Sequence, residues 1–330
     1  MKNILVTGGC GFIGSNFIRY MLKKYRDIKI INLDKLTYAG NLNNLRDTKS
    51  DKRYKFVKGD ICDSKLVNNL LSTIGHRPST IINFAAETHV DRSIKDAGAF
   101  IKTNIEGARV LLEAARKYKI KKFMQISTDE VYGDIKSGFS KETDALLPNS
   151  PYAASKAAAD LLCLSYYHTF GLPVVIARSS NNFGPYQYPE KVMPLFITNL
   201  LGGKKLPLYG DGKNIRDWLF VEDNCRGIEC ILKNGKIGEI YNIGTRTQIR
   251  NIDMAGALLK KLRLRDSYIK FVTDRPGHDR RYALDSGKIK KLGWRPKYSF
   301  NEGLDLTIGW YKNNSRWWKP LKQRARIIEW

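Results

Sequence analysis

Two short groups of residues in this 330-residue chain could move protons. Thr128, Asp129 and Glu130 directly follow the strand-like run 123–127. Two neighbouring carboxylates repel each other, which separates their pKa values and can leave one as an acid and the other as a base. A solvated acidic turn would give the same pattern, so this segment alone leaves both interpretations open.

The second group combines a phenol with an ammonium. Tyr152 and Lys156 lie in a segment with helical features, since Asn149 or Ser150 can cap it and Pro151 suits its first turn. Residues four apart share a helix face, so we expect the lysine to lower the pKa of the tyrosine, which could then act as a base toward a hydroxyl group. Because this spacing also arises by chance, it needs support from other motifs.

A glycine-rich turn near the start of the chain could hold a phosphate-bearing cofactor. Residues 7–14, Thr-Gly-Gly-Cys-Gly-Phe-Ile-Gly, join a strand-like run to a segment of helical period. Glycines let the backbone approach a pyrophosphate, and the first amides of a helix can meet its charge. Asp34 follows Gly14 by about 20 residues, where a carboxylate can accept both ribose hydroxyls and disfavour a 2′-phosphate. This favours NAD over NADP, although the neighbouring Lys35 weakens the argument from charge.

The order of apolar runs indicates how these groups are positioned. Short β-branched runs alternate with longer segments of helical period, and they lie at residues 4–7, 29–33, 55–57, 80–84, 123–127 and 173–177. This alternation predicts an α/β fold, a doubly wound parallel Rossmann sheet with right-handed crossovers. The carboxyl ends of such strands face a ligand crevice, which is where the acidic pair lies.

The pattern changes after about residue 182, where Gly, Pro and Tyr become denser and shorter mixed elements follow. We therefore expect a Rossmann domain over residues 1–182, joined by some returning C-terminal segments. A smaller C-terminal substrate-binding lobe should occupy mainly residues 183–330.

Composition excludes several classes of protein. The net charge of +25 attracts phosphate-bearing molecules, but the positive residues are spread along the chain and no nucleic-acid-binding motif accompanies them. We expect a basic surface that collects small anionic substrates rather than nucleic acid. Five scattered cysteines indicate reduced thiols, and we expect neither disulfides nor a metal site. No signal-like segment or run of ~18 apolar residues is present, so we expect a cytoplasmic protein without membrane contact.

Together these motifs resemble the extended short-chain dehydrogenase/reductase family and, within it, the dTDP-glucose 4,6-dehydratases. The resemblance spans nearly the whole chain. Besides the glycine-rich turn and the Tyr152/Lys156 pair, it includes residues 34–41, 85–93, 216–223 and 274–282. The family's Thr-Asp-Glu motif falls on Thr128, Asp129 and Glu130. The 4-epimerases on this scaffold lack the acidic pair, and UDP-glucuronate decarboxylases typically carry Ser in place of Asp129.

The resemblance implies a lyase that converts dTDP-glucose or UDP-glucose to the 4-keto-6-deoxy sugar, a step toward deoxysugars such as rhamnose. Tyr152, helped by Thr128, would take the C4 hydroxyl proton while hydride passes from C4 to NAD. Glu130 would then remove the C5 proton, and Asp129 would protonate the departing C6 hydroxyl. NADH would finally return the hydride to C6. Lys156 would hold the nicotinamide ribose.

The resemblance, together with the motifs above, also assigns binding residues. The expected NAD-binding residues are Gly8, Gly11, Phe12, Ile13, Gly14, Asp34, Lys35, Thr37, Asp60, Ile61, Ala85, Ala86, Thr103, Tyr152, Lys156 and Asn182. The expected substrate-binding residues are Thr88, Thr128, Asn181, Glu190, Lys191, Leu195, Pro207, Tyr209, Arg216, Asn251, Arg275 and His278. Arg216 is the strongest single candidate for the diphosphate because a guanidinium can grip phosphate oxygens in a bidentate manner. His278 could equally be a turn histidine, and Tyr209 could pack rather than stack on a base.

Two alternatives stay open at the level of sequence. A nucleotide-sugar 4-epimerase or a UDP-glucuronate decarboxylase would share the scaffold, and Asp129 argues against both. A non-catalytic NAD- or nucleic-acid-binding protein would explain the charge, but the complete set of proton-transfer residues argues against it. The family arrangement further implies a homodimer formed by the predicted helices 98–119 and 152–170.

Overall fold

A seven-stranded parallel sheet forms the centre of the computed structural model, which describes residues 2–73 and 79–325. Its strand order is β10-β6-β5-β4-β1-β2-β3. The strands are β1 (Asn3–Thr7), β2 (Lys29–Asp34), β3 (Tyr54–Lys58), β4 (Thr80–Asn83), β5 (Lys122–Thr128), β6 (Val174–Ser179) and β10 (Ile240–Ile243). The predicted α/β fold with a doubly wound Rossmann sheet is confirmed.

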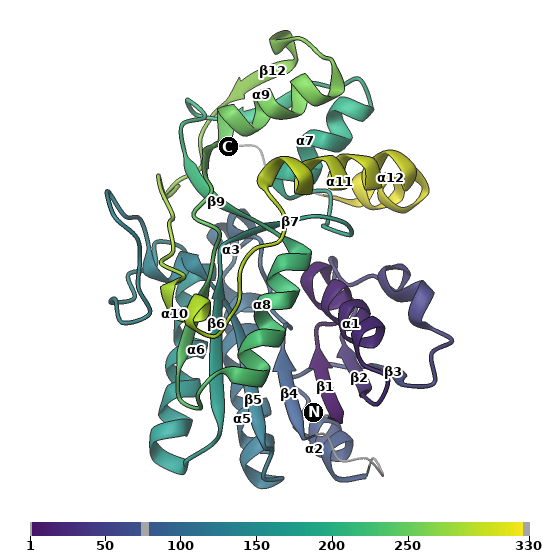
Figure 1. Ribbon diagram of the computed structural model, residues 1–330, viewed down its shortest axis with the longest axis vertical. Coiled ribbons are helices and arrows are strands. Elements are labelled where there is room, and N and C mark those ends of the chain that lie inside the picture. The colour runs from purple at the N-terminus through teal and green to yellow at the C-terminus, as the bar shows by residue number, and fades with distance from the viewer. Residues whose placement is uncertain (1, 74–78, 326–330) are drawn as a thin grey trace.

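Helices cover both faces of this sheet (Figure 1). One face packs against α1 (Phe12–Lys24) and α8 (Val221–Asn234), which bury aliphatic and aromatic side chains in a shared core. The other face packs against α2 (Ser64–Thr73), α5 (Gly107–Lys117) and α6 (Pro151–Phe170). Because most of these strands are buried on both faces, they read as nearly continuous apolar runs, which is why the sequence located them; the edge strand β3 is only partly buried.

The strand order reverses between β1 and β4, which are neighbours in the sheet: the chain runs outward from β1 to β3 and then returns to place β4 on the other side of β1. All strands of this sheet are parallel, so their carboxyl ends meet at one edge. Loops diverge at such a crossing point and leave a crevice, which is the usual ligand site of open α/β sheets.

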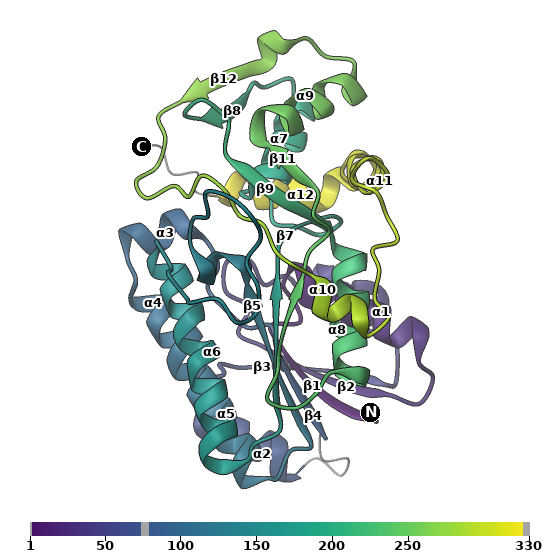
Figure 2. The same cartoon turned by 60° about the vertical axis from the view of Figure 1, so that its left-hand side comes forward.

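Segments after β6 form smaller elements beyond that edge (Figure 2). One small sheet has the order β11-β9-β7 and another pairs β12 with β8. Their strands are β7 (Asn181–Phe183), β8 (Leu206–Tyr209), β9 (Ile215–Phe220), β11 (Gln248–Arg250) and β12 (Ile269–Val272). The helices there are α7 (Val192–Leu201), α9 (Asn251–Leu262), α11 (Phe300–Asn313) and α12 (Ser315–Arg324).

These C-terminal elements share an apolar core of their own, with Phe183, Phe196 and Trp218 among its buried members. Other C-terminal segments return to the large sheet: β10 adds its edge strand, and α8 and α10 (Gly287–Lys291) pack beside it. The division into a Rossmann domain over 1–182 and a lobe over 183–330 stays a prediction.

The predicted helix 98–119 contains a local irregularity. It consists of α4 (Gly98–Phe100), a π-helical segment (Ile101–Glu106) and α5. π segments often occur at functional sites because they redirect side chains. Here the π segment includes Thr103, which lines the cleft described below, and buried Asn104, which accepts from the amide of Glu87 at 2.9 Å.

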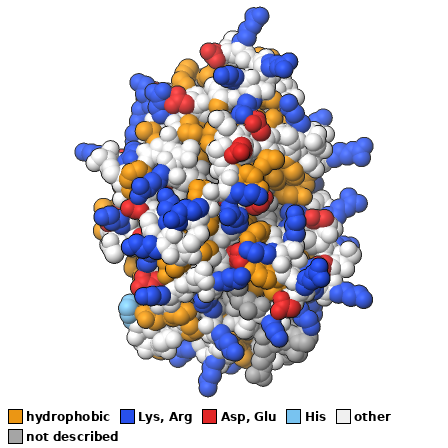
Figure 3. All heavy atoms as spheres, in the orientation of Figure 1, with side chains coloured by type: hydrophobic (Ala, Val, Ile, Leu, Met, Phe, Trp, Pro, Cys, Tyr) orange, Lys and Arg blue, Asp and Glu red, His pale blue; other side chains and the backbone are white. Residues whose placement is uncertain are grey.

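Basic side chains are spread over the visible face of the molecule, with fewer acidic ones among them (Figure 3). This matches the dispersed charge in the sequence. No helix within residues 2–73 and 79–325 has the length and apolarity needed to cross a bilayer.

Candidate active site

A single cleft gathers the carboxyl ends of the central strands. Its walls include the glycine-rich turn after β1, the ends of β2 to β6, the start of α6 and the loop that precedes α7. Every residue predicted to bind NAD lines this cleft, and so does every predicted catalytic residue.

The glycine-rich turn leaves room that side chains would fill. Gly8 has φ +68°, and a Cβ added there would lie 2.5 Å from the amide nitrogen of Ala85. A Cβ on Gly14 would lie 2.5 Å from the carbonyl oxygen of Gly8. These glycines allow the turn, the β4 loop and the start of α1 to approach closely. The first amides of α1 therefore lie at the cleft, as binding of a pyrophosphate requires.

Asp34 ends β2 and is buried, with Oδ2 accepting from the amide of Cys10 and Oδ1 from the amide of Leu36, both at 2.8 Å. Burial raises the pKa of Asp34, and the two amide hydrogen bonds oppose that shift. The Lys35 ammonium lies 2.7 Å from Asp60. Since Lys35 is paired with another carboxylate, it does not remove the preference of Asp34 for ribose hydroxyls.

The acidic pair begins a short 3₁₀ helix, η3 (Asp129–Tyr132), which directly follows β5. Thr128 caps it: its hydroxyl oxygen accepts from the amide of Glu130 at 3.3 Å. The same hydroxyl donates to Asp129 Oδ1 at 3.2 Å, while Oδ2 of this buried carboxyl has no hydrogen-bond partner within the described parts of the chain. An unpaired buried oxygen of this kind is costly unless it is protonated or meets a ligand.

The environments of the two carboxyls differ. Burial raises the pKa of Asp129 well above its usual value, and the charges of Glu130 and Asp217 add to the increase. Burial also raises the pKa of Glu130, but the cations Arg275, Lys191 and Arg216 oppose it. Asp129 is therefore the better proton donor and Glu130 the better acceptor.

Tyr152 and Lys156 lie on the first turns of α6, whose N-cap is Ser150: its hydroxyl oxygen accepts from the amide of Ala153 at 3.1 Å. Their electrostatics differ from the sequence-based expectation. The ammonium of Lys156 donates to the carbonyl of Ile126 at 2.5 Å. Burial, followed by the charge of Glu130, raises the pKa of Tyr152. The expectation that Lys156 lowers this pKa is thus wrong for the protein alone, because desolvation dominates and the lysine is turned to the end of β5.

A buried polar network supports this region from behind. Arg178 on β6 pairs with Asp160 on α6 at 2.8 Å, and Ser127 donates to the same carboxylate at 2.9 Å. Arg178 also donates to the hydroxyl of Tyr132 at 2.9 Å. The network links β5, β6, α6 and η3, the elements that carry the proton-transfer residues.

The predicted substrate-binding residues fall into two groups. Thr88, Thr128, Asn181, Glu190 and Lys191 line the cleft. Leu195, Pro207, Tyr209, Arg216, Asn251, Arg275 and His278 do not line it. Of the second group, Leu195 packs in the C-terminal apolar core, which does not support a role in binding.

Arg216 is buried, and its terminal nitrogens donate to the carbonyls of Ile215 at 2.8 Å and Asp279 at 2.9 Å. Its guanidinium also lies 4.3 Å from the centre of the Tyr282 ring. These contacts hold the side chain and use part of its donors, so the expected bidentate grip on phosphate is not pre-formed. Arg216 still lies close enough to influence the pKa of both Asp129 and Glu130.

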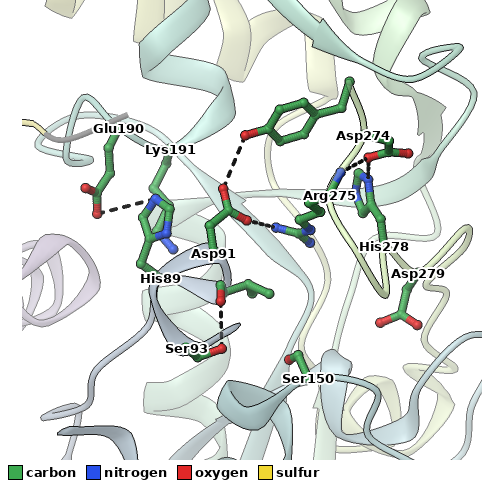
Figure 4. A network of polar contacts seen from close by, with 12 residues as sticks. His89, Asp91, Ser93, Ser150, Glu190, Lys191, Asp274, Arg275, His278 and Asp279 are labelled. Atoms are coloured by element: carbon green, nitrogen blue, oxygen red, sulfur yellow. Dashed lines mark hydrogen bonds and ion pairs between the residues drawn. The ribbon is translucent and has the colours of Figure 1, made fainter. Parts of the chain in front are cut away.

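His278 points toward Asp274, with 2.6 Å between Nδ1 and Oδ1 (Figure 4). Burial and the nearby charges of Arg275 and Arg216 lower the pKa of His278 to about 4. The ring is therefore neutral at pH 7.

Sequence reasoning missed several residues that line the cleft. Gln187 and Tyr188 were assigned no role, and Tyr38 and Glu87 were quoted only as parts of segments 34–41 and 85–93. Arg92 stacks 3.8 Å from the centre of the Tyr38 ring and pairs with Glu190 at 2.8 Å. Chemical type gave no signal here, because the contacts join segments that are distant in sequence. Within the described ranges, no cluster of three or more metal-binding side chains is present.

Comparison with known proteins places the whole chain in one family. Residues 5–307 match the family model described as GDP-mannose 4,6 dehydratase. A dTDP-glucose 4,6-dehydratase of Streptomyces niveus is 49% identical, with 97% of this chain and 95% of that protein covered. That of Escherichia coli is 45% identical, with 96% of each chain covered.

Solved structures agree. The dTDP-glucose 4,6-dehydratase of Streptomyces venezuelae, solved with NAD and dTDP bound, has a TM-score of 0.94 at 50% sequence identity. The match covers 97% of this chain and 99% of that chain. A UDP-glucose 4-epimerase of Thermotoga maritima has a TM-score of 0.88 at 32% identity, with 95% and 99% covered. The chain therefore belongs to the family whose model is described as GDP-mannose 4,6 dehydratase. Within this family it belongs to the dTDP-glucose 4,6-dehydratases.

Proposed function

We propose that this protein is an NAD-dependent lyase that converts dTDP-glucose to dTDP-4-keto-6-deoxy-glucose with loss of water. The observation that carries the proposal is the adjacent pair of buried Asp129 and partly buried Glu130, in one cleft with Tyr152, Lys156 and the glycine-rich turn. An epimerase needs no such acid and base, since no water is eliminated. The dehydratase relatives are also more similar to this chain than the epimerase structures.

NAD fits the cleft by three features. The close approaches at Gly8 and Gly14 leave a backbone cradle for a pyrophosphate. Asp34 offers a carboxylate at the end of β2. The side-chain oxygen of Asn182 is buried without a hydrogen-bond partner among the residues that the structure describes. These residues would hold NAD, which when bound would supply reversible hydride transfer with the sugar.

Tyr152 and Thr128 serve the first step in this proposal. Tyr152 in its phenolate form accepts the proton of the C4 hydroxyl as hydride leaves that carbon, which becomes a ketone. Thr128 caps η3 and contributes to the environment of Tyr152, so it can share a hydrogen bond with the same hydroxyl. Lys156 is buried four residues further along α6, where it can hold the nicotinamide ribose.

Elimination of water uses the two carboxyls. The new ketone acidifies C5, and Glu130, whose ionised form is favoured by the surrounding cations, removes the C5 proton. Asp129, whose protonated form is favoured by burial, gives its proton to the C6 hydroxyl, which leaves as water. Reduction at C6 and protonation at C5 complete the product, which would serve the synthesis of deoxysugars such as rhamnose.

Substrate binding follows from the placement of charge around Glu130. We assign the sugar to Thr88, Asn181 and Glu190, which line the cleft, and the diphosphate to Lys191, Arg216 and Arg275. Tyr209, Asn251 and His278 lie beyond the cleft, and we assign them to the nucleoside end of the substrate. Pro207 on β8 accompanies them, whereas Leu195 is left out of the assignment.

The purified protein should be incubated with dTDP-glucose and, separately, UDP-glucose in heavy water, and products followed by mass spectrometry and NMR. We expect loss of one water and deuterium at C5, with faster turnover of the thymidine nucleotide. Release of carbon dioxide from UDP-glucuronate, or inversion at C4 without loss of water, would instead identify one of the alternative enzymes.

A cytoplasmic location stays a prediction.

A homodimer is the expected assembly. The two predicted interface helices carry three of the exposed large apolar side chains: Ile101, Leu161 and Phe170 are 54%, 57% and 49% exposed. We expect light scattering to give twice the chain mass and Leu161→Arg to yield monomer. A wild-type monomer at every concentration would contradict the dimer.

A further inference from the structure

Asp91 lies outside the roles assigned so far, although it is buried at the edge of the site. It stands in the first turn of α3 (Val90–Lys95), directly after the loop that leaves β4. Only 5% of the residue is exposed. Figure 4 shows its carboxylate pointing toward Arg275.

Both carboxylate oxygens of Asp91 have partners from distant segments. Oδ1 accepts from Nη1 of Arg275 at 2.8 Å, and Oδ2 accepts from the hydroxyl of Tyr209 at 3.2 Å. Arg275 follows β12 and Tyr209 ends β8, so one carboxylate joins the large sheet to the C-terminal elements. A charge-assisted hydrogen bond of this length fixes the orientation of a guanidinium.

Arg275 keeps donors available while Asp91 holds it. Its Nε is buried and has no hydrogen-bond partner in the part of the chain that the structure describes. A buried, unpaired guanidinium nitrogen is costly, and an anionic oxygen of a diphosphate would satisfy it. The ion pair with Asp91 therefore orients Arg275 but leaves a donor of its guanidinium available to an anion.

Arg275 also acts on the proposed C5 base. Burial raises the pKa of Glu130, and Arg275 is the cation that opposes this increase most strongly. The charged or titratable groups that face Glu130 are Asp129 on η3, Tyr152 on α6, Lys191 before α7, Arg216 on β9, and Arg275, Asp279 and Tyr282 from the segment after β12.

We propose that Asp91 is a positioning residue that holds the Arg275 guanidinium where its charge favours the carboxylate form of Glu130 and its free donor receives the substrate diphosphate. Asp91 contacts no reacting atom and acts through Arg275. The inference rests on the proposed dehydratase activity, since Glu130 matters here as the base of the elimination.

The experiment compares wild-type protein with Asp91→Asn, using dTDP-glucose as the substrate and following kcat and kcat/KM across pH. We expect kcat/KM to fall on the order of tenfold, because the charge-assisted bond is lost and the guanidinium becomes mobile. We also expect the acidic limb of the kcat profile to move to higher pH, since Glu130 loses its strongest counter-charge.

The direction of this movement distinguishes positioning from simple charge. If Asp91 were only a nearby negative charge, its removal would favour ionised Glu130 and move the acidic limb to lower pH. A movement to lower pH, or no movement, would therefore overturn the proposal. If Asp91→Asn does not fold, Asp91→Glu keeps the carboxylate but displaces the guanidinium, and we expect a smaller movement in the same upward direction.

A double variant tests whether the effect passes through Arg275. In an Arg275→Ala background, Asp91→Asn should change kcat/KM by less than about twofold, because the residue through which it acts is gone. A full loss in that background would sink the proposal. Asp253→Asn is the matched control: it removes a carboxylate paired with Arg250 at 2.6 Å on the exposed surface of α9 and should leave both parameters unchanged.

Wild-type protein that fails to turn over any nucleotide sugar would refute the proposed function itself. Wild-type turnover with an unaltered Asp91→Asn profile would refute only the role of Asp91.

Discussion

At the scale of single residues, the site depends on different environments for two adjacent carboxyls, which separate the pKa value of Asp129 from that of Glu130. Asp129→Asn keeps the shape but removes the proton that the elimination needs. We expect kcat to fall by about 10²–10⁴, the usual contribution of a general acid. Oxidation at C4 should continue, so the absorbance of reduced nicotinamide should rise on the enzyme during stopped-flow mixing with substrate. Normal turnover without this accumulation would contradict Asp129 as the acid.

Tyr152→Phe tests the preceding step and should give the opposite spectrum. A phenyl ring cannot accept the C4 hydroxyl proton, so we expect kcat to fall by about 10²–10⁴ without any accumulation of reduced nicotinamide. Binding of NAD, followed by fluorescence, should remain similar because Tyr152 supplies only one contact in a large cleft. Near-normal turnover would remove the role assigned to this phenol.

At the scale of elements, the sequence located the strands but not every relation between them. The runs that became β1, β2, β4, β5 and β6 are apolar because both faces are covered, and such runs are visible without a structure. Strand β10 is short and contains Asn242, whose side chain accepts from Tyr132 at 2.9 Å and donates to the carbonyl of Ser140 at 3.0 Å. Only those distant partners explain why a polar residue belongs in an edge strand.

The candidate site, like the fold, could be predicted only in part from the sequence. Motif spacing identified the glycine-rich turn, the acidic pair and the Tyr152/Lys156 pair, since each is local in sequence. The orientation of Lys156 toward Ile126 and the placement of Arg216 against backbone carbonyls depend on contacts across the fold. Electrostatic expectations based on spacing alone therefore failed at Tyr152, where desolvation proved larger than the effect of a neighbouring charge.

The packing of α1 against α8 supplies a stability prediction. Glu229 on α8 is buried, and it accepts from Lys24 at 2.6 Å, from Tyr20 at 2.7 Å and from the hydroxyl of Tyr25. Burial opposes ionisation, but these donors together with Lys233 lower the pKa of Glu229 to about 2. We expect Glu229→Gln to reduce the free energy of unfolding by about 1–3 kcal/mol at pH 7.

The pH dependence of that difference follows from the lowered pKa. The contribution of Glu229 is complete above the unfolded-state pKa of about 4.3 and is lost as pH falls toward about 2. Urea unfolding between pH 7 and the lowest pH at which both proteins fold should show the difference shrinking below about 4.3. Glu239→Gln, which removes a more exposed carboxylate paired with Lys288 at 2.5 Å, should change stability by less than about 1 kcal/mol. A difference that grows on acidification would contradict this assignment.

At the scale of the whole molecule, the site is assembled from the N-terminal and C-terminal halves of the chain. The large sheet supplies the proton-transfer residues and the proposed NAD cradle. Cations that face Glu130 come instead from β9, the segment before α7 and the segment after β12. The negative charge of Glu130 beside buried Asp129 is therefore balanced by cations from segments that are distant in the sequence.

The net charge of +25 should influence how an anionic substrate reaches this site. A positive surface attracts a nucleoside diphosphate over distances that salt shortens, from about 30 Å at 0.01 M to about 3 Å at 1 M. We expect kcat/KM for dTDP-glucose to fall several-fold across this range of sodium chloride. In contrast, kcat should change little, since buried Asp129 and partly buried Glu130 are screened less than surface charges. Sucrose of equal osmolality controls for water activity and should leave kcat/KM nearly constant. If salt instead lowered kcat and left kcat/KM unchanged, the dispersed charge would have no part in substrate capture.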